Sequence, residues 1–176
     1  MIKTIFVAGI YGVGKDYLCD TISKLLNISK YSASQLITNI NKENYLRDKD
    51  VKDLTDNQAI LINEVNEILK KQESIILTGH MCILNKDMSI EVLPHNVFKN
   101  LSITHMILLK NKPNIIKENL LCRDNKDYSI ELIEEFQRKE EEIFNCVANG
   151  IGIKHLTIDL MYDNTDVERI IKFLEV

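Results

Sequence analysis

The sequence predicts an α/β fold, a three-layer sandwich in which a five-stranded parallel sheet carries helices on both faces. Apolar runs of strand length alternate with amphipathic helical patterns along the whole chain. A Gly-x-x-x-x-Gly-Lys loop, Gly9–Lys15, joins the first apolar run to the first helical pattern. The length of 176 residues and the hydrophobic content of 45% suit a single domain, residues 1–176, with a sizeable core.

The first half of a strand–helix–strand unit is expected at the start of the chain. The apolar run 2–8 predicts a buried strand, and 15–26 predicts a helix with an apolar face. A short second strand is expected at 28–31. Ser32 and Ser34 follow it, at the sheet edge where open α/β folds bind ligands.

A helical insert is expected between the second and third strands. Residues 35–40 are weakly helical, and the polar stretch 41–53 is typical of an exposed loop. Thr55 begins a capping box for a helix that reaches about Lys71. Together, residues 32–72 form the insert.

A third buried strand is expected at 74–78, with His80 just past its carboxyl end. Two interpretations of His80 stay open: a contact to an acceptor or phosphate, or a histidine that is merely hydrogen-bonded at a strand end. The segment 81–93 is polar and predicts a long loop. Loops of that length in compact domains are often functional.

The same alternation continues to the end of the chain. We expect a strand at 104–110, a helix from Pro113 to about Leu121, a charged link at 122–128, a helix from Ser129 to about Val147, a strand at 153–158 and a last helix from Thr165.

The Gly9–Lys15 loop predicts a phosphate site. Backbone N–H groups of such a loop wrap phosphate oxygens, and the following helix N-terminus adds a partial positive charge. Lys15 is expected to reach the terminal phosphates. The other candidate contacts are Gly9, Tyr11, Gly12, Val13, Gly14, Asp16 and Tyr17. The alternative is a glycine-rich strand-to-helix turn without a ligand.

Asp16 breaks the usual pattern of this loop. The lysine is normally followed by Ser or Thr, whose hydroxyl binds Mg²⁺. A carboxylate is a good Mg²⁺ ligand, but it adds negative charge beside the phosphates. We therefore expect Asp16 to weaken phosphate binding when no metal is present.

Composition narrows the class of partner. The net charge is −4 and no long basic run occurs, so neither nucleic acid nor an anionic membrane is an expected partner. The four cysteines lack metal-ligand spacing, and no apolar run approaches the length of about 18 residues that a membrane span needs. We expect a cytoplasmic protein, and its amphipathic helices leave a homo-oligomer open.

The order of these elements, together with GIYGVGK, resembles the P-loop nucleoside monophosphate kinases, most closely the archaeal-type adenylate kinases. The resemblance covers nearly the whole chain and implies ATP and Mg²⁺ as donor and cofactor. By position it implies monophosphate contacts from Ser32, Ser34 and Gln35 and from the stretch Arg47 to Lys52. It also makes 122–128 a shortened lid with Arg123 and Lys126 as candidate phosphate contacts, and it places Asn164 near the adenine of ATP.

Two departures from the family concern the metal and the lid. The third strand of these kinases usually ends in an aspartate that orients Mg²⁺, and Thr78 stands there instead. Their lid carries several arginines, whereas this one carries Arg123 alone. Asp16 and Thr78 are therefore the candidate metal residues.

The expected function is transfer of the γ-phosphoryl group of ATP to a nucleoside monophosphate, a small-molecule substrate. Lys15 and Arg123 are the candidate catalytic residues, because this chemistry depends on positioning and charge neutralisation. One alternative is an ATP-binding regulatory module or slow ATPase with little kinase activity. A further alternative is a kinase of another small metabolite.

Overall fold

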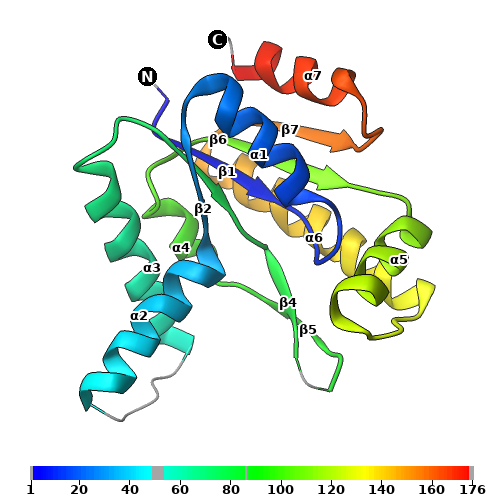
Figure 1. The fold of residues 1–176 in the computed structure, drawn as a ribbon, viewed down its shortest axis with the longest axis horizontal. Coiled ribbons are helices and arrows are strands. Elements are labelled where there is room, and N and C mark those ends of the chain that lie inside the picture. Colours follow the sequence, from blue (N-terminus) through cyan, green and yellow to red (C-terminus); the bar gives the residue numbers. More distant parts are fainter. Residues whose placement is uncertain (1, 49–53, 86, 175–176) are drawn as a thin grey trace.

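The computed structural model describes residues 2–48, 54–85 and 87–174. Five parallel strands form one sheet in the order β2-β3-β1-β6-β7 (Figure 1). Their bounds are Thr4–Ala8 for β1, Ser29–Ser32 for β2, Ile75–Thr78 for β3, Ile103–Lys110 for β6 and Lys154–Asp159 for β7. The predicted five-stranded parallel sheet is confirmed.

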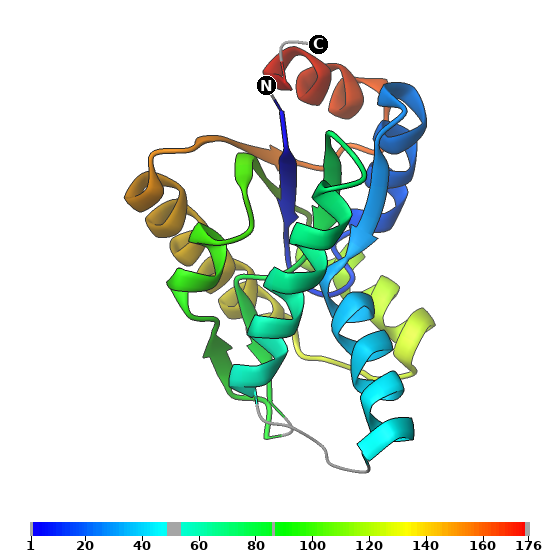
Figure 2. The ribbon, with the colours of Figure 1, turned by 90° about the vertical axis from the view of Figure 1, so that its left-hand side faces the viewer.

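Helices cover both faces of this sheet, as predicted. Figure 2 shows α1 (Lys15–Leu26) on one side and α6 (Ile130–Ile151) with α4 (His95–Lys99) on the other. Further contacts join α7 (Asn164–Leu174) to α1 and α5 (Pro113–Asp124) to α6. Every residue of β1 and β3 is buried, so the core lies on these two central strands.

The strand register brings three strand ends together. Thr78 of β3 lies opposite both Val7 of β1 and Ser32 of β2. The phosphate loop leaves β1 two residues after Val7. Ser32, Thr78 and the loop are therefore neighbours at the carboxyl edge of the sheet.

The helical insert consists of α2 (Ala33–Asp48) and α3 (Leu54–Leu69), which pack against each other (Figure 1). The prediction of an exposed loop at 41–53 is wrong for residues 41–48, which continue α2. Packing against a second helix overrides the weak helical pattern, and Asn41 donates a hydrogen bond of 2.8 Å to Asn57 on α3. Residues 49–53 lie outside the described chain.

The prediction of a long loop at 81–93 is wrong as well. Cys82–Leu84 (β4) and Ile90–Val92 (β5) form an antiparallel hairpin, and α4 follows it. The backbone N–H of Leu93 also donates to Met81 O at 2.9 Å. Strands of three residues are too short to show a period in the sequence, and the hairpin depends on backbone pairing.

The charged link is shorter than predicted. Residues 122–124 form the last turn of α5, which ends at Asn125 in the left-handed region, with φ of 52° and its N–H bonded to Leu121 O at 3.0 Å. Only 125–129 connects α5 to α6. None of the described helices is long and apolar enough to span a membrane.

Candidate active site

The glycine loop turns tightly between β1 and α1. Gly12 and Gly14 have φ angles of 75° and 112°, which side-chain-bearing residues rarely adopt. A Cβ atom on Gly12 would lie 2.8 Å from Cγ of Leu120, and one on Gly14 would lie 3.0 Å from the hydroxyl of Tyr162. Conformation and space both require glycine at these two positions.

The amine of Lys15 lies folded back into the loop. It donates hydrogen bonds to the carbonyls of Gly9 and Ile10, the latter at 3.1 Å. Burial lowers the pKa of Lys15 to about 8, against the opposing effect of the Glu140 carboxylate. Lys15 therefore stays mostly protonated at pH 7 and presents a weakly solvated cation.

His80 lies beside this amine. Its Nδ1 is 2.7 Å from Gly9 O and 3.5 Å from Lys15 Nζ. Because a carbonyl only accepts, we assign the proton to Nδ1 and leave Nε2 unprotonated. Burial, followed by the charge of Lys15, lowers the pKa of His80 well below 6.5, so the imidazole is neutral at pH 7.

Glu140 lies beneath the loop and was missed by the sequence analysis. Its side chain is 1% exposed and accepts N–H groups from Gly9, Met81 and Cys82 at 2.8–3.1 Å. Burial raises the pKa of Glu140 to about 7, although these N–H groups and Lys15 favour the anion. A signal existed, because Glu140 lies in the apolar stripe between Phe136 and Phe144 of α6.

A cavity of about 580 Å³ opens at this edge of the sheet. It brings together most of the predicted site residues. Those that line it are Tyr11, Gly12, Val13, Gly14, Lys15, Asp16, Ser32, Ser34, Thr78, His80 and Arg123. Gly9, Tyr17, Gln35 and Asn164 do not line it. The side chains of Arg47 and Lys52 lie outside the described part of the structure.

The far half of the cavity is largely apolar and was not predicted. Its walls come from the insert, the hairpin and α4, through Ile37, Leu61, Ile83, Leu93, Val97 and Phe98. Phe98 packs edge-on against Phe6 of β1, with ring centroids 5.4 Å apart. Asn57 and Gln58 of α3 add two amides to the same half. The insert was predicted, whereas the hairpin and α4, which supply Ile83, Val97 and Phe98, were not.

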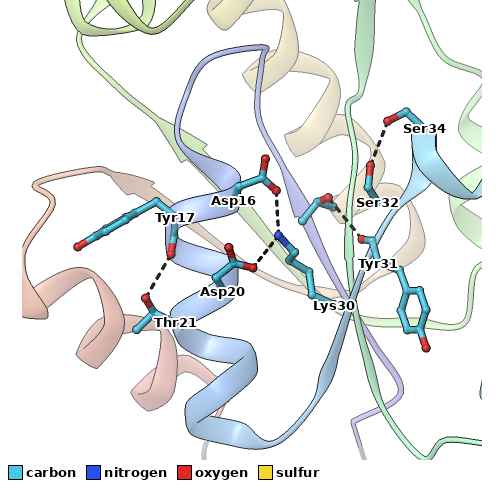
Figure 3. A network of polar contacts seen from close by, with 9 residues as sticks. Asp16, Tyr17, Asp20, Thr21, Lys30, Tyr31, Ser32 and Ser34 are labelled. Atoms are coloured by element: carbon cyan, nitrogen blue, oxygen red, sulfur yellow. Dashed lines mark hydrogen bonds and ion pairs between the residues drawn. The ribbon is translucent and has the colours of Figure 1, made fainter. Parts of the chain in front are cut away.

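Asp16 lies at the mouth of the cavity and is paired with a cation. Lys30 of β2 binds Asp16 at 2.9 Å and Asp20, one turn further along α1, at 2.7 Å (Figure 3). The Asp16 side chain is 86% exposed, so solvent screens this pair strongly. Lys30 offsets part of the negative charge that Asp16 brings to the loop.

The described residues supply too few ligands to bind Mg²⁺ alone, so phosphate oxygens of a substrate would have to complete its coordination. No group of three or more His, Cys, Asp or Glu side chains gathers as a metal site in the described residues. Mg²⁺ commonly takes one or two carboxylates and completes its shell with water and substrate phosphates. Asp16 fits this scheme, and the Thr78 hydroxyl, which donates a long bond of 3.4 Å to Tyr31 O, is weakly engaged.

Arg123 lines the cavity from the last turn of α5. Its Nε and Nη2 each donate a bond of 2.6 Å to the carboxylate of Asp124. This fork is the geometry with which arginine binds a phosphoryl group. In this structure Asp124 occupies the Nε–Nη2 edge of the guanidinium, and Nη1 makes none of the bonds found among the described residues.

Aromatic rings lie on the outer side of Gly14, away from the chamber. Tyr17 packs against Tyr162 with centroids 5.7 Å apart, and both rings are exposed. Asn111 fixes Tyr162 by a bond of 2.6 Å to its hydroxyl and donates to Val13 O at 3.1 Å. Asn164 begins α7 two residues later. These two exposed rings, tilted by 57° to each other, lie next to the phosphate loop.

Comparison with known proteins agrees with this geometry. The sequence profile of an AAA domain family matches residues 8–137, from the end of β1 into α6. The chain belongs to this AAA domain family. No curated protein sequence matches it.

Solved kinase structures share its fold. A shikimate kinase from Bacteroides thetaiotaomicron matches with a TM-score of 0.64 and 16% identity over the whole of both chains. A sugar kinase from Janibacter sp. HTCC2649 matches with 0.60 and 14%, over 100% of this chain and 96% of that one. A gluconokinase from Sinorhizobium meliloti 1021 matches with 0.56 and 14%, over 95% and 87%. The fold is thus that of P-loop kinases, and the nearer resemblance to adenylate kinases stays a prediction.

The first testable prediction concerns the metal. Wild-type protein should bind ATP much more weakly in EDTA than in Mg²⁺, because Asp16 then faces the polyphosphate without a cation. Asp16→Ser should improve binding in EDTA and reduce the ratio of the two affinities by roughly fivefold to tenfold, allowing for solvent screening and for Lys30. Calorimetric titration of ATP under both conditions measures that ratio.

Asp20→Ser is the matched control, since Asp20 binds the same lysine and does not line the cavity. It should leave the ratio near the wild-type value. Equal affinity of the wild type in EDTA and Mg²⁺ would remove Asp16 as a metal ligand.

Proposed function

We propose that the protein is an ATP- and Mg²⁺-dependent kinase that transfers the γ-phosphoryl group to a nucleoside monophosphate. One observation carries the proposal: a single cavity runs from Lys15 and the phosphate loop into the apolar chamber. Donor and acceptor would meet inside one enclosure. Exclusion of water from such a site favours transfer to the acceptor over hydrolysis.

Charge neutralisation would come from three groups of this chain. The loop amides and Lys15 bind the β- and γ-oxygens, and Arg123 closes over the migrating group. Mg²⁺, held through Asp16 with Thr78 nearby, supplies further neutralisation of the phosphate oxygens. The exposed rings of Tyr17 and Tyr162 offer a stacking surface for the adenine of ATP, near Asn164.

The acceptor would lie in the far half of the cavity. Its apolar walls suit a planar base, and the amides of Asn57 and Gln58 are able to hydrogen-bond the edge of such a base. Ser32 and Ser34, whose hydroxyls are 3.0 Å apart, lie nearer the loop. In this proposal they bind the acceptor phosphate together with Arg47 and Lys52, whereas Gln35, which does not line the cavity, has no part in it.

A second candidate is a kinase of a small metabolite with an uncharged hydroxyl acceptor. Among the described residues that line the cavity, Lys15 and Arg123 are the only cations, and the proposal above uses both for the phosphates of ATP. A monophosphate acceptor is usually bound by further arginines, whereas an uncharged hydroxyl acceptor needs none. In this candidate His80, which is neutral and lies beside Lys15, would take the hydroxyl proton through Nε2.

The third candidate is an ATP-binding regulatory module. Thr78 in place of a strand-end carboxylate favours slow chemistry, because one hard ligand for the metal is lost. Tight binding of ATP without acceptor-dependent turnover is its signature.

A screen of acceptors separates these candidates. Nucleoside monophosphates, nucleosides, and hydroxyl compounds such as shikimate and gluconate are each incubated with ATP and Mg²⁺, and ADP release is measured. The primary proposal requires turnover that depends on a monophosphate, and the second requires turnover with an unphosphorylated acceptor. ADP release by Lys15→Ala gives the background rate. ATP binding without any acceptor-dependent turnover would rule out both kinase candidates and favour the regulatory module.

A further inference from the structure

Glu140 connects two segments that are far apart in the sequence. Its Oε1 accepts the N–H of Gly9 at 3.1 Å and that of Met81 at 2.9 Å, and its Oε2 accepts Met81 at 2.9 Å and Cys82 at 2.8 Å. Gly9 is the first residue after β1, and Met81 follows His80. An ionised carboxylate is acceptor-only on both oxygens, so it satisfies three donors at once.

The backbone of Gly9, through the two peptide groups that meet at its Cα, connects this contact to the site. Its N–H binds Glu140, while its carbonyl accepts from Lys15 Nζ and from His80 Nδ1. His80 is held a second time, because the next residue in the chain also donates its N–H to Glu140. Lys15 and His80 therefore both bond to a residue that this buried carboxylate holds.

Gln137 repeats the arrangement one turn earlier on α6. Its amide exchanges two bonds of 3.0 Å with the backbone of Asn111, directly after β6. Residues three apart lie on one face of a helix. This face of α6 thus hydrogen-bonds to the segments that directly follow β1, β3 and β6. Glu140 itself does not line the cavity.

We infer that Glu140 is a positioning residue of the nucleotide site: its carboxylate fixes the start of the phosphate loop against the segment that follows β3. The inference rests on the nucleotide binding proposed above. It assigns to Glu140 the positioning of Lys15 and His80, both of which are bonded to the carbonyl of Gly9. A buried glutamate with a stabilising role alone would leave these two side chains in place when it is neutralised.

Glu140→Gln is the variant that tests this role. Glutamine has the same length but one acceptor oxygen, and its NH₂ group would face N–H donors. Glu141→Gln is the matched control, because the neighbouring carboxylate pairs with Lys110 at 2.7 Å and contacts nothing in the loop. The probes are ADP with Mg²⁺, titrated by calorimetry, and the ¹⁵N resonances of the His80 ring in nucleotide-free protein.

We expect Glu140→Gln to fold, to bind ADP–Mg²⁺ roughly tenfold more weakly, and to lose the single Nδ1-protonated tautomer of His80. Glu141→Gln should match the wild type in both measurements. Folded Glu140→Gln with wild-type affinity and an unchanged His80 tautomer would overturn the inference.

Two further results are informative. If Glu140→Gln does not fold, wild-type protein with ¹³C-labelled glutamate carries the test: ADP–Mg²⁺ must move the carboxyl resonance of Glu140 and leave that of Glu141, and an unmoved Glu140 resonance overturns the inference. If the wild type binds no ADP, the proposed function fails. The tautomer comparison, made without nucleotide, still decides the role of Glu140 in that case.

Discussion

Lys15→Ala should lower the affinity for ATP by roughly 100-fold while leaving the protein folded. The side chain donates to loop carbonyls and contributes little to the apolar core, so its loss removes a phosphate contact rather than packing. Charge-assisted hydrogen bonds of this kind are about twice as strong as neutral ones, and 100-fold in affinity corresponds to about 2.7 kcal/mol. Calorimetric titration of ATP–Mg²⁺ measures the loss, and circular dichroism checks the fold.

Lys24→Ala is the matched control, because Lys24 lies in the last turn of the same helix, away from the cavity. It should bind ATP as the wild type does. Lys15→Met keeps most of the apolar stem and should behave like the alanine variant. Wild-type affinity in a folded Lys15 variant would remove the phosphate site on which the proposed function depends.

The lowered pKa of Lys15 gives this prediction a pH signature. In the nucleotide-free protein Lys15 loses its proton as the pH rises through about 8, so the cation that attracts phosphate is depleted above that pH. The phosphoryl groups of ATP are fully ionised in this range and do not change. Wild-type affinity should fall between pH 7.5 and 9.5, and the affinity of Lys15→Ala should stay flat.

Local signals explain why the sheet and the phosphate loop could be predicted. The two central strands, β1 and β3, are buried and mostly apolar runs, and the loop needs glycine for its positive φ angles at Gly12 and Gly14. Helix α1 was predicted with the bounds it has, since the loop fixes its start and its apolar face fixes its length. Such features depend on residues close in the sequence.

The closed half of the site could not be predicted in the same way. The hairpin strands β4 and β5 have three residues each, and they exist because their backbones pair across a turn. The ion pair of Lys30 with Asp16 likewise depends on the approach of β2 to α1. Glu140 was the exception, because a charged residue on the apolar face of a long helix already signals a buried partner.

The second large effect is expected from Arg123→Ala, which should slow turnover by 10²- to 10³-fold and change ATP affinity less than threefold. The guanidinium is bound to Asp124 in the nucleotide-free protein, so it adds little to ground-state binding. Its fork matters when charge develops on the migrating phosphoryl group, where the loss of one preorganised donor costs about 2.7–4 kcal/mol. ADP release with the acceptor found in the screen measures the effect.

Two variants define the role of this arginine. Arg138→Ala on α6 removes an exposed arginine 4.0 Å from Glu142 and outside the cavity, and should leave turnover unchanged. Asp124→Asn removes the charge that pairs with Arg123 and competes with phosphate for its Nε–Nη2 edge, so it should keep turnover at or above the wild-type rate. Because the two residues are partners, a purely structural role would make Asp124→Asn and Arg123→Ala fail alike, whereas a role in transfer separates them. Wild-type turnover in Arg123→Ala would show that the last turn of α5 has no part in phosphoryl transfer.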